Sequence, residues 1–230
     1  MMISVIIPTL NESSTIARTL THTVALGFDE IIVSDGGSTD PTIPMIQACC
    51  ARIPAVRLVT APAGRARQLN EGVKACRGAA LLFLHADTEL PPTARTAIES
   101  ALENTRCVGG RFDVRFDPPS RWGDVISWFM NRRSRLTGIA TGDQAIFVHR
   151  EIFEQMGGFP DIPLMEDIEF SRRLKRRGPT AALTDRVTTS FRRWEKNGPL
   201  RTILLMWTLR FLYWLGINPT RLNHWYRAVR

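Results

Sequence analysis

Polar and charged side chains gather directly after four apolar stretches of the sequence. The groups are PTLNE (8–12), SDGGSTD (34–40), APAGRARQLN (61–70) and HADTE (85–89). Each group by itself is explained by a turn or a helix cap. If the apolar stretches are parallel strands of one sheet, however, their carboxyl ends meet at one edge, where ligands bind in such sheets. The carboxylates, amides and arginines would then form one ligand site.

A nucleoside diphosphate suits such a site. Carboxylates accept hydrogen bonds from a base and from ribose hydroxyls, while arginines and a divalent cation neutralise the two phosphates. The sequence has no G-x-G-x-x-G after the first apolar stretch and no G-x-x-x-x-G-K-[ST] anywhere, so it lacks the dinucleotide and P-loop fingerprints. Asp87 leaves two interpretations open, a metal ligand or a cap that accepts backbone N–H groups before the next helix.

The elements that must position these residues alternate in the first half of the chain. Apolar runs predict strands at 3–8, 30–35, 56–60 and 80–84, and helices at 11–27, after Pro41, at 64–77 and after Pro92. This alternation favours a parallel α/β sheet covered on both faces. The pattern then changes to a half-exposed strand at 109–117, an amphipathic helix at 121–135, a strand at 144–150 and a helix at 166–178.

Charge is distributed unevenly along the 230 residues, a length that suits one large domain. The net charge is +8, but residues 172–230 carry +12 and the preceding residues −4. A basic tail on a mildly acidic body indicates a polyanionic partner, either nucleic acid or an anionic membrane surface. The four cysteines lack metal-site spacing and no secretory leader is evident, which favours a cytoplasmic protein.

The stretch ILLMWTLRFLYWLGI (203–217) is too short to cross a bilayer, which takes about 20 apolar residues. We expect it to lie at a membrane interface, with Trp207, Tyr213 and Trp214 at headgroup level. The basic side chains that would reach lipid headgroups are Arg201, Arg210, Arg221 and Arg227. A core or dimer helix is the alternative. The predicted organisation is a domain at 1–190 and a basic, apolar membrane-interface segment at 191–230, held peripherally at the inner face of the plasma membrane.

Five motifs, in order, resemble the family-2 glycosyltransferases with the GT-A fold. They are VIIPTLNE, IIVSDGGSTD, GRARQLNEG, LLFLHADT and GGFPDIPLMEDIEFSRRLKRRG, and the resemblance covers about residues 2 to 180. The likeness is greatest to a small bacterial subgroup with GRARQ and GDQ (142–144). It implies an α/β GT-A fold, with a mainly parallel central sheet flanked by helices, followed here by the apolar, basic helical appendage.

The resemblance also implies roles for the residues at the strand ends. Asp87 inherits the metal position, for Mg²⁺ or Mn²⁺. His85 stands where the family usually has the first Asp of Asp-x-Asp, so it either contacts the ligand or packs at the strand end. The residues expected at the donor nucleotide are Thr9, Glu12, Asp35, Arg65, Asn70, His85 and Ala86.

Glu166 and Asp167 resemble the family's acidic pair at the start of an acceptor-side helix. Inverting transfer is a one-step displacement in which the acceptor hydroxyl loses its proton, and a carboxylate performs that abstraction. Asp167 is the expected base and Glu166 its support, unless both only favour the positive end of a helix. Asp143 and Gln144 are expected at the donor sugar or the acceptor. Arg192-Arg193-Trp194 partly resembles an element of processive synthases, or is a basic surface beside a membrane.

The resulting hypothesis is an inverting, metal-dependent glycosyltransferase. It would move sugar from a nucleotide-diphosphate sugar, with a UDP-sugar favoured, to a hydroxyl of a lipid or polyprenyl-linked acceptor. A sugar-phosphate nucleotidyltransferase would need a glycine-rich, lysine-containing loop after the first strand, which PTLNE lacks. A nucleic-acid-binding module would interleave bases and aromatic residues on one surface, whereas here acids gather at the strand ends, so no nucleic-acid partner is expected. The sequence does not indicate the oligomeric state.

Overall fold

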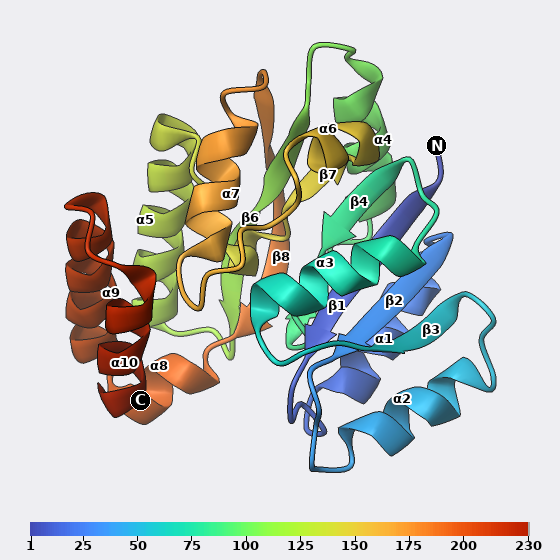
Figure 1. The fold of residues 1–230 in the computed structure, drawn as a ribbon, viewed down its shortest axis with the longest axis horizontal. Helices are drawn as coiled ribbons and strands as arrows, with labels where there is room; N and C mark the ends of the chain where they lie inside the picture. Colours follow the sequence, from blue (N-terminus) through green and yellow to red (C-terminus); the bar gives the residue numbers. More distant parts are fainter. Residues whose placement is uncertain (230) are drawn as a thin grey trace.

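The computed structural model describes residues 1–229 of the chain. The side chains of Arg193 and Arg227, for which the sequence predicts a surface role, lie outside the described part. Within residues 1–229 the strands form one curled eight-stranded sheet in the order β3-β2-β1-β4-β7-β6-β8-β5, with helices on both faces (Figure 1). The α/β fold predicted from the sequence is confirmed.

The first half of the chain follows the predicted alternation closely. Its elements are β1 (Ile3–Thr9), α1 (Ile16–Ala25), β2 (Glu30–Asp35), α2 (Thr42–Cys50), β3 (Val56–Thr60), α3 (Arg65–Ala75), β4 (Ala80–Phe83), β5 (Thr88–Glu89) and α4 (Ala94–Glu103). Helix α1 begins later than residue 11 because the preceding loop is held elsewhere. There Asn11 has a left-handed backbone (φ 56°), and its N–H donates to Ser38 Oγ at 2.8 Å.

The second half adds the rest of the sheet and the C-terminal helices. Its elements are β6 (Gly109–Asp117), α5 (Arg121–Thr137), η1 (Gly142–Gln144), β7 (Phe147–His149), α6 (Arg150–Gln155), α7 (Glu166–Leu174), β8 (Thr180–Ser190), α8 (Arg192–Asn197), α9 (Pro199–Trp214) and α10 (Pro219–Val229). Strand β8 was not predicted, because its sequence TAALTDRVTTS has few large apolar residues. It pairs in parallel with β6 along most of its length.

Strand register brings the predicted polar groups to one edge of the sheet. Strands β3, β2, β1 and β4 are parallel, and Thr9 lies opposite Asp35, which lies opposite Thr60. Strand β7 then runs antiparallel to both β4 and β6, so the sheet is parallel in its first half and mixed beyond it. Side chains of β1 alternate between two buried clusters, Val5 and Ile7 in one and Ile6 in the other, which confirms that both faces are covered.

The half-exposed strand predicted at 109–117 is wrong for most of its length. Residues 109–114 are all buried, because β6 lies inside the sheet between β7 and β8. Its charged residues are accommodated by pairing. Buried Arg111 donates to Asp113 Oδ1, and Arg135 of α5 lies 2.6 Å from Asp113 Oδ2. A polar/apolar alternation in the sequence thus reflects a buried ion-pair network.

The C-terminal helices α9 and α10 stand beside α5 at one end of the molecule (Figure 1, red). Leu209 of α9 and Leu222 of α10 are buried in a cluster with Met165, which precedes α7. The opposite side of α9 is open, since Trp207 is 65% and Trp214 78% exposed. Among the helices described, none combines the length and the apolar content needed to span a membrane.

Candidate functional site

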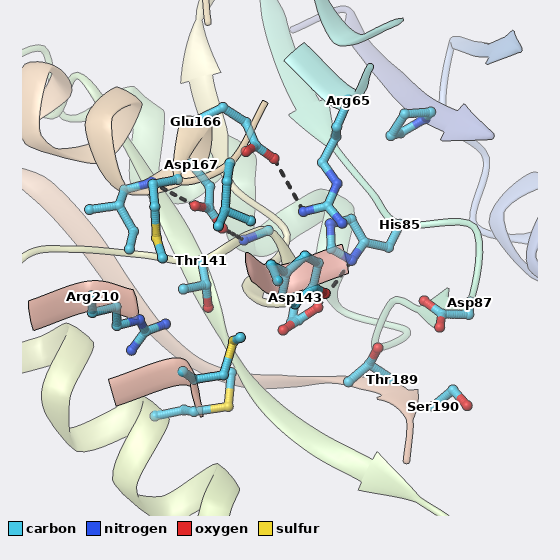
Figure 2. Close-up of a pocket in the computed structure, with 18 of the residues that line it drawn as sticks. Arg65, His85, Asp87, Thr141, Asp143, Glu166, Asp167, Thr189, Ser190 and Arg210 are labelled. Atoms are coloured by element: carbon cyan, nitrogen blue, oxygen red, sulfur yellow. Dashed lines mark hydrogen bonds and ion pairs between the residues drawn. The ribbon is translucent and has the colours of Figure 1, made fainter. Parts of the chain in front are cut away.

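A large pocket of about 1720 Å³ opens at the carboxyl edge of β1 and β4. Its walls come from the first turns of α3 and α7, from η1, and from α5 and α9 (Figure 2). The pocket therefore joins the strand-end groups to helices from the second half of the chain. The predicted site residues that line it are Thr9, Glu12, Arg65, His85, Ala86, Asp87, Asp143, Glu166 and Asp167.

Three predicted site residues do not line the pocket, because neighbouring groups hold their side chains. Asp35 is buried at the end of β2 and accepts hydrogen bonds from Gly37 N–H (2.9 Å) and Thr9 Oγ1 (3.2 Å). Asn70 pairs through its amide with the backbone of Phe159 in both directions, each at 2.9 Å. Gln144 is fully buried and donates to Ser134 Oγ at 3.0 Å. These amides brace the loops that surround the pocket.

Glu166 is a buried carboxylate at the first position of α7. Its Oε1 lies 3.2 Å from Nη1 of Arg65, the first residue of α3. Burial raises the pKa of Glu166, and Asp167 adds to the rise, while Arg65 and His85 oppose it. For Arg65, desolvation lowers the pKa, but Glu166, Asp167 and Asp143 outweigh it and raise the pKa. Arg65 is thus a permanent cation beside a carboxylate that ionises less readily than usual.

Asp167 lies beside Glu166 and faces η1. Its Oδ2 accepts from Gly142 N–H at 2.8 Å and its Oδ1 from Ile168 N–H at 2.7 Å (Figure 2). The residue before the acidic pair, Met165, has a left-handed backbone (φ 69°) and is buried against α9 and α10. Such a conformation costs energy in a residue with a side chain and persists where surrounding packing enforces it. The C-terminal helices therefore fix the start of α7 and the direction of both carboxylates.

His85 contacts Asp143 across the floor of the pocket. Its Nδ1 lies 3.1 Å from Asp143 Oδ1, and its ring is 16% exposed. The Nε2 atom is buried, lacks a hydrogen-bond partner among the described residues, and packs so closely on Gly142 that a Cβ there would overlap it. His85, η1 and Asp167 consequently form one connected unit, since Gly142 N–H donates to Asp167.

Asp87 does not cap a helix. The next helix, α4, begins after Thr93, and within residues 1–229 no backbone N–H donates to the Asp87 carboxylate. Its Oδ2 lies 3.8 Å from Nη2 of Arg192, which also lies 3.4 Å from Glu12 Oε2. Arg192, considered from the sequence as part of a surface element, thus lines the pocket beside two acids.

The sequence also matches a known family. Residues 4–157 match the family model described as glycosyl transferase family 2. The chain belongs to this family. Its five motifs had indicated the same family from the sequence. No curated protein is significantly similar to this family 2 glycosyltransferase in sequence.

Solved structures with the same fold include S. aureus TarS (residues 1–349) and the mannosyltransferase PcManGT from Pyrobaculum calidifontis in complex with GDP-Man and Mn²⁺. The TarS fragment superposes with a TM-score of 0.66 at 15% identity, covering 83% of this chain and 60% of TarS residues 1–349. For PcManGT the TM-score is 0.65 at 23% identity, covering 81% of this chain and 56% of PcManGT. This chain therefore spans less than two thirds of either protein, and the GT-A fold is what they share.

The family implies a divalent cation, and the residues at Asp87 fit one. The protein would supply only a small share of its ligands. Within the part of the chain that the structure describes, no three acids, histidines or cysteines converge as a metal cage. Mg²⁺ commonly binds through one or two carboxylates together with substrate phosphates and water. The partly exposed Asp87 carboxylate, 25% accessible at the pocket wall, supplies such a ligand.

Two arginines that were not predicted at the site line the far side of the pocket. Arg210 of α9, expected at lipid headgroups, lies inside the pocket (Figure 2), as does Arg133 of α5. Burial lowers the pKa of Arg133 to about 10, with Arg210 contributing, and burial also lowers the pKa of Arg210. No local signal identifies them, because their position depends on how α5 and α9 pack.

Proposed function

We propose that this family 2 glycosyltransferase moves a sugar from a nucleotide-diphosphate sugar to an acceptor hydroxyl with inversion at the anomeric carbon. The observation that carries the proposal is the placement of Asp87 and of Glu166–Asp167 in one pocket, on walls that face each other. The donor diphosphate would lie at Asp87 and Arg192. The acceptor would enter over the start of α7.

In the proposed reaction Asp167 takes the proton of the acceptor hydroxyl. The acceptor oxygen forms a bond to the anomeric carbon as the bond from that carbon to the β-phosphate oxygen breaks, and the nucleoside diphosphate leaves with the electron pair. Asp167 suits this role because its two backbone hydrogen bonds fix its direction. A divalent cation bound at Asp87 would neutralise the departing diphosphate. Glu166 and Arg65 would hold the base in place.

The identity of the donor is proposed from the relatives. TarS has been crystallised with UDP-GlcNAc, and PcManGT with GDP-Man and Mn²⁺. Both donors are nucleotide-diphosphate sugars, and the cation agrees with the expectation of Mg²⁺ or Mn²⁺ here. We favour a UDP-sugar for this chain.

We further propose that the protein works on a lipid or polyprenyl-linked acceptor at the cytoplasmic face of the membrane. The support is an exposed apolar surface on two helices that stand side by side, defined by Trp122, Trp128 and Phe129 of α5 and Leu204, Trp207 and Phe211 of α9. We call it the aromatic face. Soluble monomers rarely expose so many large apolar side chains together. Exposed Arg121, Arg132 and Arg201 on the same helices would complement anionic headgroups.

Thermal unfolding with a panel of UDP-, GDP- and dTDP-sugars, with and without Mn²⁺, tests the donor proposal. A donor present at about a hundredfold excess over its Kd stabilises the protein by about 2.7 kcal/mol. Stabilisation by one nucleotide, dependent on the cation, is the expected result. Donor binding does not require the acceptor, so the absence of stabilisation by every donor would contradict the proposal.

A further inference from the structure

We propose that Arg133 and Arg210 form a binding site for the phosphate group of an amphiphilic acceptor. This inference rests on the proposed function and specifies its acceptor. The two arginines come from different helices, α5 and α9, and both line the pocket. They are distinct from the residues expected to hold the donor diphosphate, because in Figure 2 Arg210 lies on the opposite side of the pocket from Asp87, with Thr141 and Asp143 between them.

The hydrogen-bonding capacity of this arginine pair is largely unused by the protein. Arg133 donates from Nη1 to the carbonyl oxygen of Ile139 at 3.2 Å, but its Nε and Nη2 are buried without a partner in the described structure. Arg210 is half-buried, so its guanidinium is open to the pocket, and no described residue accepts a hydrogen bond from it. Buried donors normally have partners, so the two Arg133 atoms indicate a missing acceptor.

The charges around Arg133 and Arg210 also favour a bound anion. Burial and the neighbouring cation lower the pKa of Arg133, while the attraction of Asp167 opposes this effect without a hydrogen bond. Asp167 and Asp143 likewise attract Arg210. An anion seated between the two guanidinium groups would relieve their mutual repulsion and satisfy their free donors. Arginine forks match the oxygen geometry of phosphate and bind it through paired hydrogen bonds.

The pocket wall beside the arginines is apolar, and from it we infer that the ligand has an apolar part. Trp128 and Phe129 of α5 and Met206 and Trp207 of α9 line the same pocket. Trp128, Phe129 and Trp207 are also more than half exposed, so the wall continues into the aromatic face. A ligand with its phosphate at the arginine pair would lay an alkyl chain along this wall toward the membrane. Its hydroxyl would then be presented to Asp167.

Octyl phosphate, used below its critical micelle concentration, is the probe for this site. Calorimetric titration of wild type should detect binding, and Arg133→Gln and Arg210→Gln should each weaken it at least tenfold. Arg210→Lys keeps the charge and should retain part of the affinity. The control variants are Arg106→Gln and Arg176→Gln, both exposed and outside the pocket, and these should bind as wild type does. Melting temperatures of all variants establish that each is folded.

Each other outcome overturns a defined part of the proposal. Absence of binding to wild type, or equal losses in the control variants, would overturn the arginine site. Inorganic phosphate binding as tightly as octyl phosphate would overturn the lipid assignment in favour of a soluble phosphate. Octyl glucoside binding as tightly would overturn the phosphate assignment. The nucleotide-sugar panel is measured on the same variants, so loss of donor stabilisation everywhere contradicts the proposed function and leaves the phosphate site standing.

Discussion

Arg65 and Glu166 join the first residues of two helices that are 101 positions apart in the sequence, with Nη1 donating to Oε1 at 3.2 Å. A cation at a helix N-terminus is unfavourable because the helix dipole is positive there. The Glu166 carboxylate of α7 offsets this unfavourable interaction of Arg65 with the dipole of α3. This pair connects the start of α3 to the acidic pair of α7, which we propose faces the acceptor.

The buried carboxylate of Glu166 should leave a signature in the pH dependence of stability. Burial raises its pKa above 4.5, so the folded protein holds this proton more tightly than the unfolded chain. The contribution of Glu166 to the free energy of unfolding is therefore complete below pH 4.5 and is lost as the pH rises through the raised pKa. Relative to wild type, Glu166→Gln should gain stability across that window.

The gain amounts to roughly 1.4 kcal/mol for each tenfold difference in proton affinity between the folded and unfolded states. Thermal unfolding from about pH 4 to about pH 8 measures it. Glu103→Gln, which removes an exposed carboxylate at the end of α4 outside the pocket, provides the control. A difference between Glu166→Gln and wild type that is constant with pH would contradict the raised pKa.

Replacing Asp87 by Asn should remove the dependence of donor binding on the cation. A neutral amide holds Mg²⁺ or Mn²⁺ less well than a carboxylate does, so donor affinity in the presence of Mn²⁺ should fall on the order of tenfold, about 1.4 kcal/mol. Titration of the donor with and without Mn²⁺ measures this. The exposed Asp124→Asn variant serves as the control, and wild-type metal dependence in Asp87→Asn would remove this residue from the site.

Asp167→Asn should separate donor binding from transfer. The amide oxygen still accepts from Gly142 N–H, which preserves the contact with η1, while the NH2 group gives up the bond from Ile168 N–H and takes no proton. The rate of transfer should fall by about 10² to 10⁴ with donor affinity unchanged. Asp161→Asn is the matched variant, because Asp161 lines the same pocket but pairs with Arg67. Near-normal transfer by Asp167→Asn would show that another group is the base.

Gly142 and His85 should behave as a coupled pair. A methyl group on Gly142 overlaps His85 Nε2 and must displace the ring, which should destabilise the protein by about 1 to 3 kcal/mol. In the His85→Ala background the same Gly142→Ala change should cost little, because the obstructing ring is gone. Melting temperatures of wild type, the two single variants and the double variant give the coupling energy between the two positions. If the two substitutions had additive effects on stability, the overlap would be contradicted.

The aromatic face should control attachment to vesicles. Moving about 100 Å² of apolar side chain out of water contributes about 2.5 kcal/mol, so Trp128→Ala with Trp207→Ala should weaken binding to anionic vesicles by tenfold or more. Added salt should also weaken the binding of wild type to anionic vesicles, since the basic residues contribute to that binding. Co-sedimentation measures both. Met2→Ala, on the exposed start of the chain, should bind normally, and an unaffected double variant would place attachment elsewhere.

The sequence predicted the first half of the fold well because its signals are local. The β1, β2 and β4 runs are apolar and buried, and turn residues follow each of them. Parallel pairing then fixes where their ends lie, so the meeting of Thr9 with Asp35 followed from the expected topology. Strand β8 was missed because its sequence has few large apolar residues, and its place depends on a partner, β6, that lies 71 residues earlier.

The candidate site was predictable where motifs mark strand ends and helix starts, and less so where packing decides. Asn70 and Gln144 sit inside motifs, yet their side chains turn to backbone and hydroxyl groups that a sequence pattern does not reveal. Arg133 and Arg210, in contrast, were not predicted at the site and do line the pocket. They belong to helices that look like surface or membrane elements, and the packing of those helices turns both arginines into the pocket.

The buried contact between Met165 and the C-terminal helices limits how this enzyme can be re-engineered. Met165 adopts its left-handed backbone beneath Leu209 and Leu222, directly before the acidic pair. Grafting the last two helices of another transferase onto this chain, in order to redirect it to a new acceptor, would thus also rotate the carboxylates that follow. Under the proposed mechanism, acceptor choice and proton abstraction would be coupled through this contact, and chimeras would have to carry the residues around 165 along with the helices.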